Sequence, residues 1–286
     1  MDIKYNRANN GTVTIKTKST AEEVFTAKTK AINQLSQFVT VPGFRTGKAP
    51  AAMSEGYIKE DKILEEVLNE IINSTYTQTV EKEGISPITQ PTVNFQEFDE
   101  QHKINLTEIL SKGVNYEIIS YTIPDIKLND WEQTVKKAQL HQKKKVKTDD
   151  KISPPDAPKT LQDEDTPEQK IEDIIFDALI SEVKFELPEA IIQGEADQII
   201  YRQIQTVQRL GVSYEDFLKI QKKTLEEIQK IALEEAEKTV RIRFIISEIA
   251  KNLDKKLGEN PKVTDVIEYL VKLNNPKIAE STDIQK

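Results

Sequence analysis

The chain has 286 residues, enough for two domains with separate cores, and 31% of them are charged, with a formal net charge of -8. The negative balance argues against a general binder of polyanions such as DNA, and the lack of cysteine excludes disulfides, thiolate metal sites and a cysteine nucleophile. No apolar run approaches the roughly 20 residues of a membrane span, and the first residues lack the apolar core of a signal peptide. We therefore expect a cytoplasmic protein that does not enter membranes.

The charge is unevenly distributed along the first part of the chain. Residues 1–50 contain 8 Lys and Arg against 3 Asp and Glu, a net of +5, whereas residues 51–123 contain 5 against 13, a net of -8. A basic front end on an acidic protein indicates a face that meets an anionic partner. The alternative is that short windows fluctuate by several charges without any functional cause.

A strand and an amphipathic helix are predicted first. Residues 12–17 alternate β-branched and polar side chains, as strands do, and Thr20 and Glu23 have the spacing of a capping box that begins a helix. This helix is expected to bury one face, formed by Val24, Phe25, Ala31, Ile32, Leu35 and Phe38.

A longer helix and three strand-like runs complete the N-terminal domain. The helix is predicted over about 61–83 and ends at Gly84, and the runs cover 92–98, 103–110 and 115–123. This order predicts an α+β domain over residues 1–123, with helices packed on an antiparallel sheet.

Between the two predicted helices lies a loop, residues 41–50, that cannot itself be helical. Pro42 and Pro50 bias the residues before them toward extended geometry. Gly43 and Gly47 permit tight turns with positive φ. The sequence therefore predicts a stiff connection with a defined shape.

The same loop carries one aromatic and two cationic side chains. Arg45 and Lys48 suit phosphate or carboxylate groups, and Phe44 beside them suits a protein pocket or the face of a base. We expect all three to point outward. The alternative, of about equal weight from composition alone, is an ordinary loop whose Phe44 folds back into the core.

A polar connector is predicted after the first domain. Residues 130–145 could form a helix, and residues 143–165 then hold six Lys, six Asp or Glu, three Pro and no aromatic residue. Such a segment buries too little apolar area to order itself. We assign residues 124–165 to this helix and connector, and expect a disordered tail over 277–286.

The apolar spacing over residues 166–276 predicts an all-α domain of helical arms. The helices are interrupted by a break at residues 185–189, and Thr224 caps a long helix. Residues 240–249 of that helix are apolar almost all round and should form its buried centre. A last helix is expected over about 264–273.

The apolar residues near the expected arm tip and cradle are candidate contacts for unfolded polypeptides. If the helical domain leaves part of an apolar stripe uncovered, that surface can bind other polypeptides weakly and reversibly. The alternative for each residue is packing against a neighbouring helix, which is the commoner role of a helical apolar stripe. The candidates are Ile199, Ile200, Leu210, Val212, Tyr214, Phe217 and Leu218.

No catalytic, metal or cofactor motif is found. The sequence lacks G-x-S-x-G, a Walker A loop, a dinucleotide fingerprint and H-E-x-x-H. The glycines before Lys48 have neither the spacing nor the preceding strand of a phosphate-binding loop. His102 and His141 are too far apart in the sequence to suggest a metal site. We therefore expect no catalytic residue, no metal and no cofactor.

The loop resembles a known family. Its six fixed positions, set between two amphipathic helices, are similar to the ribosome-docking signature of trigger factor, the bacterial chaperone for nascent chains. The positions read Gly43-Phe44-Arg45-x-Gly47-Lys48-x-Pro50. The family usually has a second basic residue after the arginine, where this chain has Thr46. Residues 84–91, residues 121–128 and the Leu187-Pro188 break also resemble the family, so the likeness covers nearly the whole chain except the connector.

The resemblance implies a function. Residues Gly43, Phe44, Arg45, Thr46, Gly47 and Lys48 would bind the large ribosomal subunit at the exit tunnel, through a ribosomal protein and rRNA. The helical domain would shield nascent or unfolded polypeptides without ATP. Most of the family carries a prolyl-isomerase domain where this chain has only the connector, so the resemblance implies the chaperone without the enzyme. Two alternatives remain: a free cytosolic holdase or homodimeric helical scaffold, and a prolyl isomerase with an unrecognised site.

Overall fold

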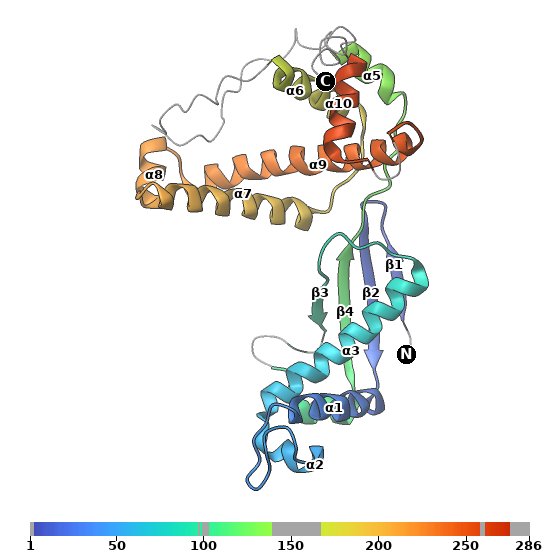
Figure 1. Ribbon diagram of the computed structural model, residues 1–286, viewed down its shortest axis with the longest axis vertical. Coiled ribbons are helices and arrows are strands. Elements are labelled where there is room, and N and C mark those ends of the chain that lie inside the picture. Colours follow the sequence, from blue (N-terminus) through green and yellow to red (C-terminus); the bar gives the residue numbers. More distant parts are fainter. Residues whose placement is uncertain (1–2, 97, 99–102, 139–166, 258–260, 275–286) are drawn as a thin grey trace. The chain divides into compact units, whose positions relative to one another are not determined.

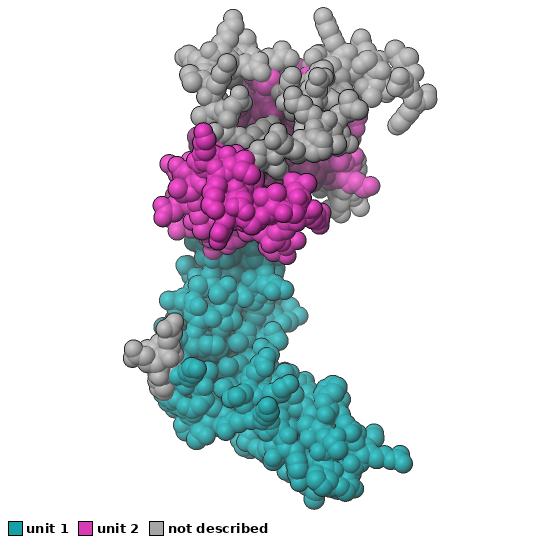
Figure 2. Space-filling view, turned by 90° about the vertical axis from the view of Figure 1, so that its left-hand side faces the viewer, with its two compact units in different colours: residues 1–123 teal, residues 124–286 magenta. Residues whose placement is uncertain are grey.

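The computed structural model describes residues 3–96, 98, 103–138, 167–257 and 261–274. The chain divides into two compact units, unit 1 of residues 1–123 and unit 2 of residues 124–286 (Figure 2). Unit 1 is α+β and unit 2 is helical in its described part, as the sequence predicted. The expected connector of 143–165, the tail of 277–286, His102 and His141 lie outside the described residues.

Unit 1 is built on an antiparallel sheet with the strand order β1-β2-β4-β3 (Figure 1). Alternate side chains of β2 and β4 are buried, so one face of the sheet carries the core. The register places Ile15 opposite Ile118, both 0% exposed, at the centre of that core. The strands are β1 (Lys4–Arg7), β2 (Thr12–Ser19), β3 (Thr92–Phe95) and β4 (Val114–Tyr121).

Helices cover the buried face of the sheet. Their apolar residues form one cluster with those of β2 and β4. The capping box is confirmed: the Thr20 hydroxyl accepts the Glu23 N–H over 3.3 Å, and the Glu23 carboxylate accepts the Thr20 N–H over 2.8 Å. Gly84, with φ of 62°, ends the long helix as expected. The helical elements are α1 (Ala21–Ser36), α2 (Ala51–Ser54), the 3-10 turn η1 (Glu55–Tyr57), α3 (Glu60–Glu83) and α4 (Leu106–Lys112).

A buried hydroxyl cluster joins α3 to the sheet. The Tyr116 hydroxyl lies 2.7 Å from the Thr75 hydroxyl and 3.3 Å from the Ser19 hydroxyl. Because burial disfavours the phenolate, it raises the pKa of Tyr116 above its ordinary value. The hydroxyls of Tyr76 and Ser120 form a second link over 2.9 Å. These contacts fix the helix that leads away from the loop and η1.

The predicted strand over 103–110 is wrong. The chain instead forms helix α4, because the Asn105 side chain accepts the Glu108 N–H over 2.9 Å and caps a helix. Leu106 and Ile109, three residues apart, then bury on the same side. The residues whose alternation suggested a strand include the first turn of this amphipathic helix.

Two further differences concern the start of the chain. β1 was not predicted, because Lys4–Arg7 has no apolar alternation; it forms by pairing with β2, with Tyr5 opposite Ile15. The expected burial of Phe25 and Phe38 is wrong, since these rings are 63% and 80% exposed. The stripe of α1 that is buried lies one residue away from Phe25 and consists of Val24, Ala27, Ala31 and Ile32.

Unit 2 has one main core. It is formed by the C-terminal half of α9 together with α5, α6 and α10. Ile245 and Ile249 are 0% exposed, which confirms the predicted burial of residues 240–249. The Asn274 amide donates to the carbonyl of Val135 over 2.7 Å and joins α10 to α5. The bounds are α5 (Trp131–Lys137), α6 (Pro167–Glu182), α9 (Leu225–Leu257) and α10 (Val263–Asn274).

A helical hairpin extends from this core. Helix α7 (Glu189–Arg209) lies beside the N-terminal half of α9, with α8 (Tyr214–Gln221) at the turn (Figure 1). The two helices meet through the small residues Ala196, Ala232 and Ala236, which permit a close approach.

Candidate functional site

The loop after α1 is built from two turns. In the first, the Phe44 N–H donates to the carbonyl of Val41 over 3.0 Å, with Pro42 and Gly43 at the two central positions. Gly43 has φ of 87°, which is the geometry that a type II turn requires there. The Pro-Gly pair thus sets the direction in which Phe44 leaves the backbone.

The second turn depends on Gly47. The Lys48 N–H donates to the carbonyl of Arg45 over 2.9 Å, and Gly47 has φ of 73°. The Gly47 N–H donates to the carbonyl of Val39 over 3.1 Å, and a Cβ at this position would collide with the backbone carbonyl of Gln37. Glycine is therefore needed at position 47 for both its φ and its close contact.

The structure places the aromatic and cationic side chains of this loop outward. Phe44 is 41% exposed, and Arg45 and Lys48 are both exposed. Neither cation forms an ion pair with any described residue. By contrast, Lys28 on α1 pairs with Glu55 over 2.7 Å. The alternative in which Phe44 folds into the core is therefore wrong.

Thr46 holds the loop closed. Its hydroxyl lies 2.8 Å from the hydroxyl of Thr40, so the side chain joins the two turns to the segment that follows α1. At this position the sequence departs from the resemblance, which has a second cation there. The structure therefore shows a positioning contact in place of a charge.

Further exposed apolar side chains lie on the elements that flank the loop, and sequence reasoning missed them. Phe38, 80% exposed, follows α1, while Met53 in α2 and Tyr57 in η1 are 56% and 55% exposed. Each lies within a few residues of a helix end, where the helical periodicity used to assign buried faces breaks down. The location of these three residues near helix ends is the sequence feature from which their exposure could have been predicted.

In unit 2, the candidate contacts for unfolded polypeptides differ in exposure. Leu210 is 54% exposed, whereas Phe217 is 2% exposed and stacks on Tyr214 with ring centroids 5.8 Å apart. Phe217 therefore supports the turn of the hairpin and does not offer a surface, which corrects its assignment. The half-buried candidates are Ile199, Ile200, Val212, Tyr214 and Leu218.

Other apolar residues of the hairpin are more exposed than most of those predicted. Ile220 in α8 is 56% exposed and Leu225, the first residue of α9, is 48% exposed. Together with Leu210 after α7, they gather at the α8 end of the hairpin. Tyr201, 63% exposed, lies midway along α7.

The buried carboxylate of Glu195 in unit 2 has a structural role. Glu195 in α7 is 9% exposed, and its carboxylate pairs with Arg243 over 3.0 Å and with Arg202 over 3.5 Å. Both oxygens are engaged, so this group is no general base. Within the part of the chain that the structure describes, no cluster of His, Cys, Asp or Glu could hold a metal ion.

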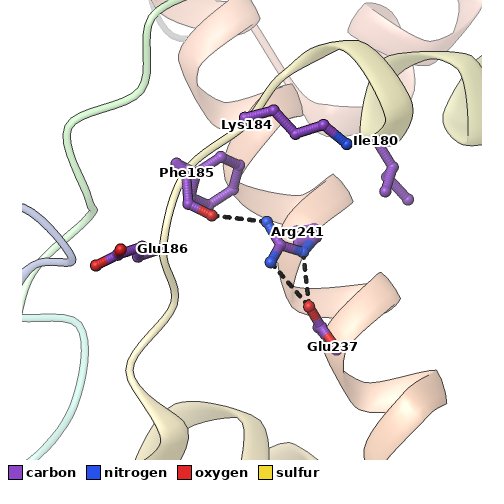
Figure 3. Close-up of a pocket in the computed structure, with 6 residues that line it drawn as sticks. All are labelled: Ile180, Lys184, Phe185, Glu186, Glu237 and Arg241. Atoms are coloured by element: carbon purple, nitrogen blue, oxygen red, sulfur yellow. Dashed lines mark hydrogen bonds and ion pairs between the residues drawn. The ribbon is translucent and has the colours of Figure 1, made fainter.

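A hollow of about 500 Å³ lies between the end of α6, the extended segment after it and α9 (Figure 3). Arg241 donates from Nη1 to the carbonyl of Phe185 over 2.8 Å and from Nη2 to the Glu237 carboxylate over 2.8 Å. Its guanidinium also lies 5.3 Å from the centroid of the Phe185 ring. The hollow is lined by Ile180, Lys184, Phe185, Glu186, Glu237 and Arg241.

Comparison with known families assigns the chain that carries this loop and hairpin to one family. Residues 1–155 match the family described as "Bacterial trigger factor protein (TF)", and residues 160–280 match that family's C-terminus. The chain belongs to the trigger factor family. The two matched ranges leave only residues 156–159 between them, so no isomerase domain separates them.

Individual members of the trigger factor family match over shorter stretches. Trigger factor of Carboxydothermus hydrogenoformans is 33% identical over 107 residues, which is 37% of this chain and 22% of that protein. Trigger factor of Corynebacterium jeikeium is 31% identical over 106 residues, 35% of this chain and 20% of that protein. The matches therefore span about a fifth of the length of these relatives.

A solved structure shares the fold. It is titled "Promiscuous Substrate Recognition in Folding and Assembly Activities of the Trigger Factor Chaperone". The TM-score is 0.50 at 14% sequence identity, and the match covers 98% of this chain and 95% of that chain.

In the described part of the chain, every helix is too short or too polar to span a bilayer.

Proposed function

We propose that this trigger factor family member is an ATP-independent chaperone that docks at the ribosomal exit tunnel through residues 43–48. One observation carries the proposal: Phe44, Arg45 and Lys48 are exposed on a loop whose shape is fixed by two glycine turns. A preorganised loop loses little conformational entropy when it binds. The family to which the chain belongs supports the same reading.

The chemistry of the loop indicates what it meets. Phe44 packs into an apolar pocket of a ribosomal protein, as exposed aromatic anchors do in protein interfaces. Arg45 and Lys48 pair with acidic side chains or rRNA phosphates, which suit a planar guanidinium and a compact ammonium. Neither cation has to break an existing ion pair with a described residue before it binds.

The hairpin of unit 2 is the proposed surface for nascent or unfolded polypeptides. Leu210, Ile220 and Leu225 present apolar area at the α8 end, and Tyr201 extends it along α7. An exposed apolar patch of this kind binds apolar segments weakly and releases them without a nucleotide. The protein acts in the cytoplasm, where ribosomes and nascent chains are found.

The chain acts without prolyl-isomerase activity in this proposal. The family matches meet at residues 156–159, which leaves no room for the aromatic-lined pocket of an isomerase domain between them. A proline-limited refolding assay tests this point. Acceleration of the slow refolding phase by the purified chain would support the isomerase alternative.

Co-sedimentation with bacterial ribosomes tests the docking site. The wild type is compared with Phe44→Ala/Arg45→Ala/Lys48→Ala and with a control, Phe25→Ala/Lys18→Ala/Lys103→Ala, that removes an exposed ring and two exposed cations outside the loop. We expect the wild type and the control to pellet with ribosomes and the loop variant to remain in solution. If nothing pellets, the chain is a free cytosolic holdase; if all three pellet equally, the contact lies elsewhere.

A further inference from the structure

The segment that joins α6 to α7 has the pattern of a β-strand but belongs to no sheet in the described structure. Val183 is 2% exposed, Lys184 and Glu186 are exposed, and Phe185 and Leu187 are half-buried. This alternation over residues 183–187 is the period of an extended strand. The segment is not helical and ends at Pro188, the residue before α7.

The main chain of this segment is largely unpaired. The carbonyl of Phe185 accepts from Arg241, and the backbone N–H and C=O groups of Lys184 and Glu186 have no hydrogen-bond partner among the described residues. In an extended strand, the two groups of one residue lie on one edge and those of its neighbours on the other. Since the Phe185 carbonyl faces Arg241, the groups of Lys184 and Glu186 lie on the opposite edge.

The hollow beside the segment is lined by two apolar and four charged residues, and the charges balance. Figure 3 shows the Phe185 ring and Ile180 on its walls, with Arg241 held by Glu237 and by the Phe185 carbonyl. Lys184 and Glu186 carry opposite charges, and so do Arg241 and Glu237. With no net charge in the lining, a ligand is recognised by its main chain and its apolar side chains.

We propose that residues 184–186 bind an extended, uncharged polypeptide segment by adding it as a strand along their free edge. A client backbone supplies the donors and acceptors that Lys184 and Glu186 lack, while the Phe185 carbonyl stays bound to Arg241 on the other edge. This recognition reads main chain and not sequence, which suits a chaperone with varied clients. The inference rests on the proposed chaperone function and names the conformation in which a client binds.

Peptide binding to the full chain tests the inference. The probe is a fluorescein-labelled ten-residue peptide that alternates valine and serine, and its partner is the same peptide N-methylated at every residue, which has no backbone N–H to donate. We expect binding of the first by fluorescence anisotropy and a loss of about tenfold or more for the second, since two hydrogen bonds are removed.

Two variants place the site on the chain. Glu186→Pro removes one backbone N–H, whereas Glu186→Ala removes only the side chain and keeps the main chain intact. We expect Glu186→Pro to weaken binding of the unmodified peptide several-fold more than Glu186→Ala does. Far-UV circular dichroism checks that the variants are folded, and if Glu186→Pro is not, the two peptides on the wild type decide alone.

Three results would overturn the inference: no binding of the unmodified peptide, equal binding of the two peptides, or equal losses in the two variants. These results are separable from failure of the proposed function. A wild type that pellets with ribosomes and suppresses aggregation but ignores the peptide refutes only the strand-addition site. A chain that shows the expected peptide pattern but never pellets refutes only ribosome docking.

Discussion

The backbone N–H of Gly47 donates to the carbonyl of Val39 over 3.1 Å, which ties the far end of the exposed loop to the segment that follows α1. This bond encloses residues 40–46, which include Phe44 and Arg45, and Lys48 follows directly after it. The presentation of Phe44, Arg45 and Lys48 therefore depends on the backbone geometry at Gly47.

Alanine at the two loop glycines should have unequal effects. Gly43 needs its positive φ but has open space around it, so Gly43→Ala costs about 1–2 kcal/mol of backbone strain. Gly47→Ala adds a collision with the carbonyl of Gln37 and must displace the loop. We expect Gly47→Ala to lower the melting temperature more and to abolish ribosome co-sedimentation, while Gly43→Ala only weakens it. Identical behaviour of the two variants would argue against this loop geometry.

Thr46→Arg should restore a cation at the cost of the hydrogen bond to Thr40. If the loop cations meet rRNA phosphates, one more phosphate contact makes the dependence of log affinity on log salt concentration steeper by about 0.9. Ribosome binding should therefore tighten at low salt and converge with the wild type at high salt. Thr46→Val, which loses the hydroxyl without adding charge, is the matched control and should keep the wild-type slope. A slope unchanged by arginine would mean that position 46 does not face the partner.

Tyr116→Phe should change how stability depends on alkaline pH. Burial raises the folded-state pKa of Tyr116 above the ordinary value of tyrosine, so this group's contribution to stability is fully present below that ordinary value and is lost as pH rises through the folded pKa. The wild type should lose stability in that window, because the unfolded chain releases the tyrosine proton at a lower pH than the folded chain. Urea unfolding between pH 9 and 11 should show a shallower decline for Tyr116→Phe. Tyr57→Phe, at an exposed position, should decline like the wild type; a Tyr116→Phe curve parallel to the wild type would count against the buried hydroxyl cluster.

Ala236→Leu should separate the helices of the hairpin. Ala236 is 0% exposed at the contact of α9 with α7, so a larger side chain overpacks this contact and destabilises it by about 1–3 kcal/mol. Ala190→Leu, on the exposed start of α7, makes the same change where there is room. Hydrogen exchange should rise in α7 and α8 for the first variant and not for the second. Unchanged protection in Ala236→Leu would contradict the small-residue contact.

Local chemistry explains why most of the helices could be predicted. Three of the predicted helix boundaries depend only on residues that are close together in the sequence. They are the capping box of Thr20 and Glu23, the left-handed Gly84 and the break at Pro188, and the structure confirms each of them. The buried centre of α9 could also be predicted, because a run that is apolar on all sides has only one stable environment.

The missed features depend on partners that lie far away in the sequence. β1 is a polar segment that becomes a strand only because β2 is there to pair with it. The burial of α1 is decided by which side of the helix meets α3 and α4, and a shift of one residue moves Phe25 from the core to solvent. The alternating pattern after α6 could be noticed in the sequence, but only the structure shows that the backbone groups of Lys184 and Glu186 have no hydrogen-bond partner among the described residues.

The loop could be located from sequence because its glycines and prolines are adjacent to the residues they position. What the sequence could not give was the exposure of Phe44, since an aromatic residue in a loop packs inward as often as outward. The role of Thr46 also required the structure, because its partner Thr40 lies across the loop.

Photo-crosslinking from position 44 tests the central claim most directly. A photoreactive phenylalanine analogue replaces Phe44 in the full chain, and the same analogue at the exposed Tyr201 of unit 2 serves as the control. With vacant ribosomes, we predict that the probe at position 44 labels one protein of the large subunit at the exit tunnel and that the probe at position 201 does not. Ribosomes that bind the chain but give no crosslink from position 44 would contradict docking through this loop.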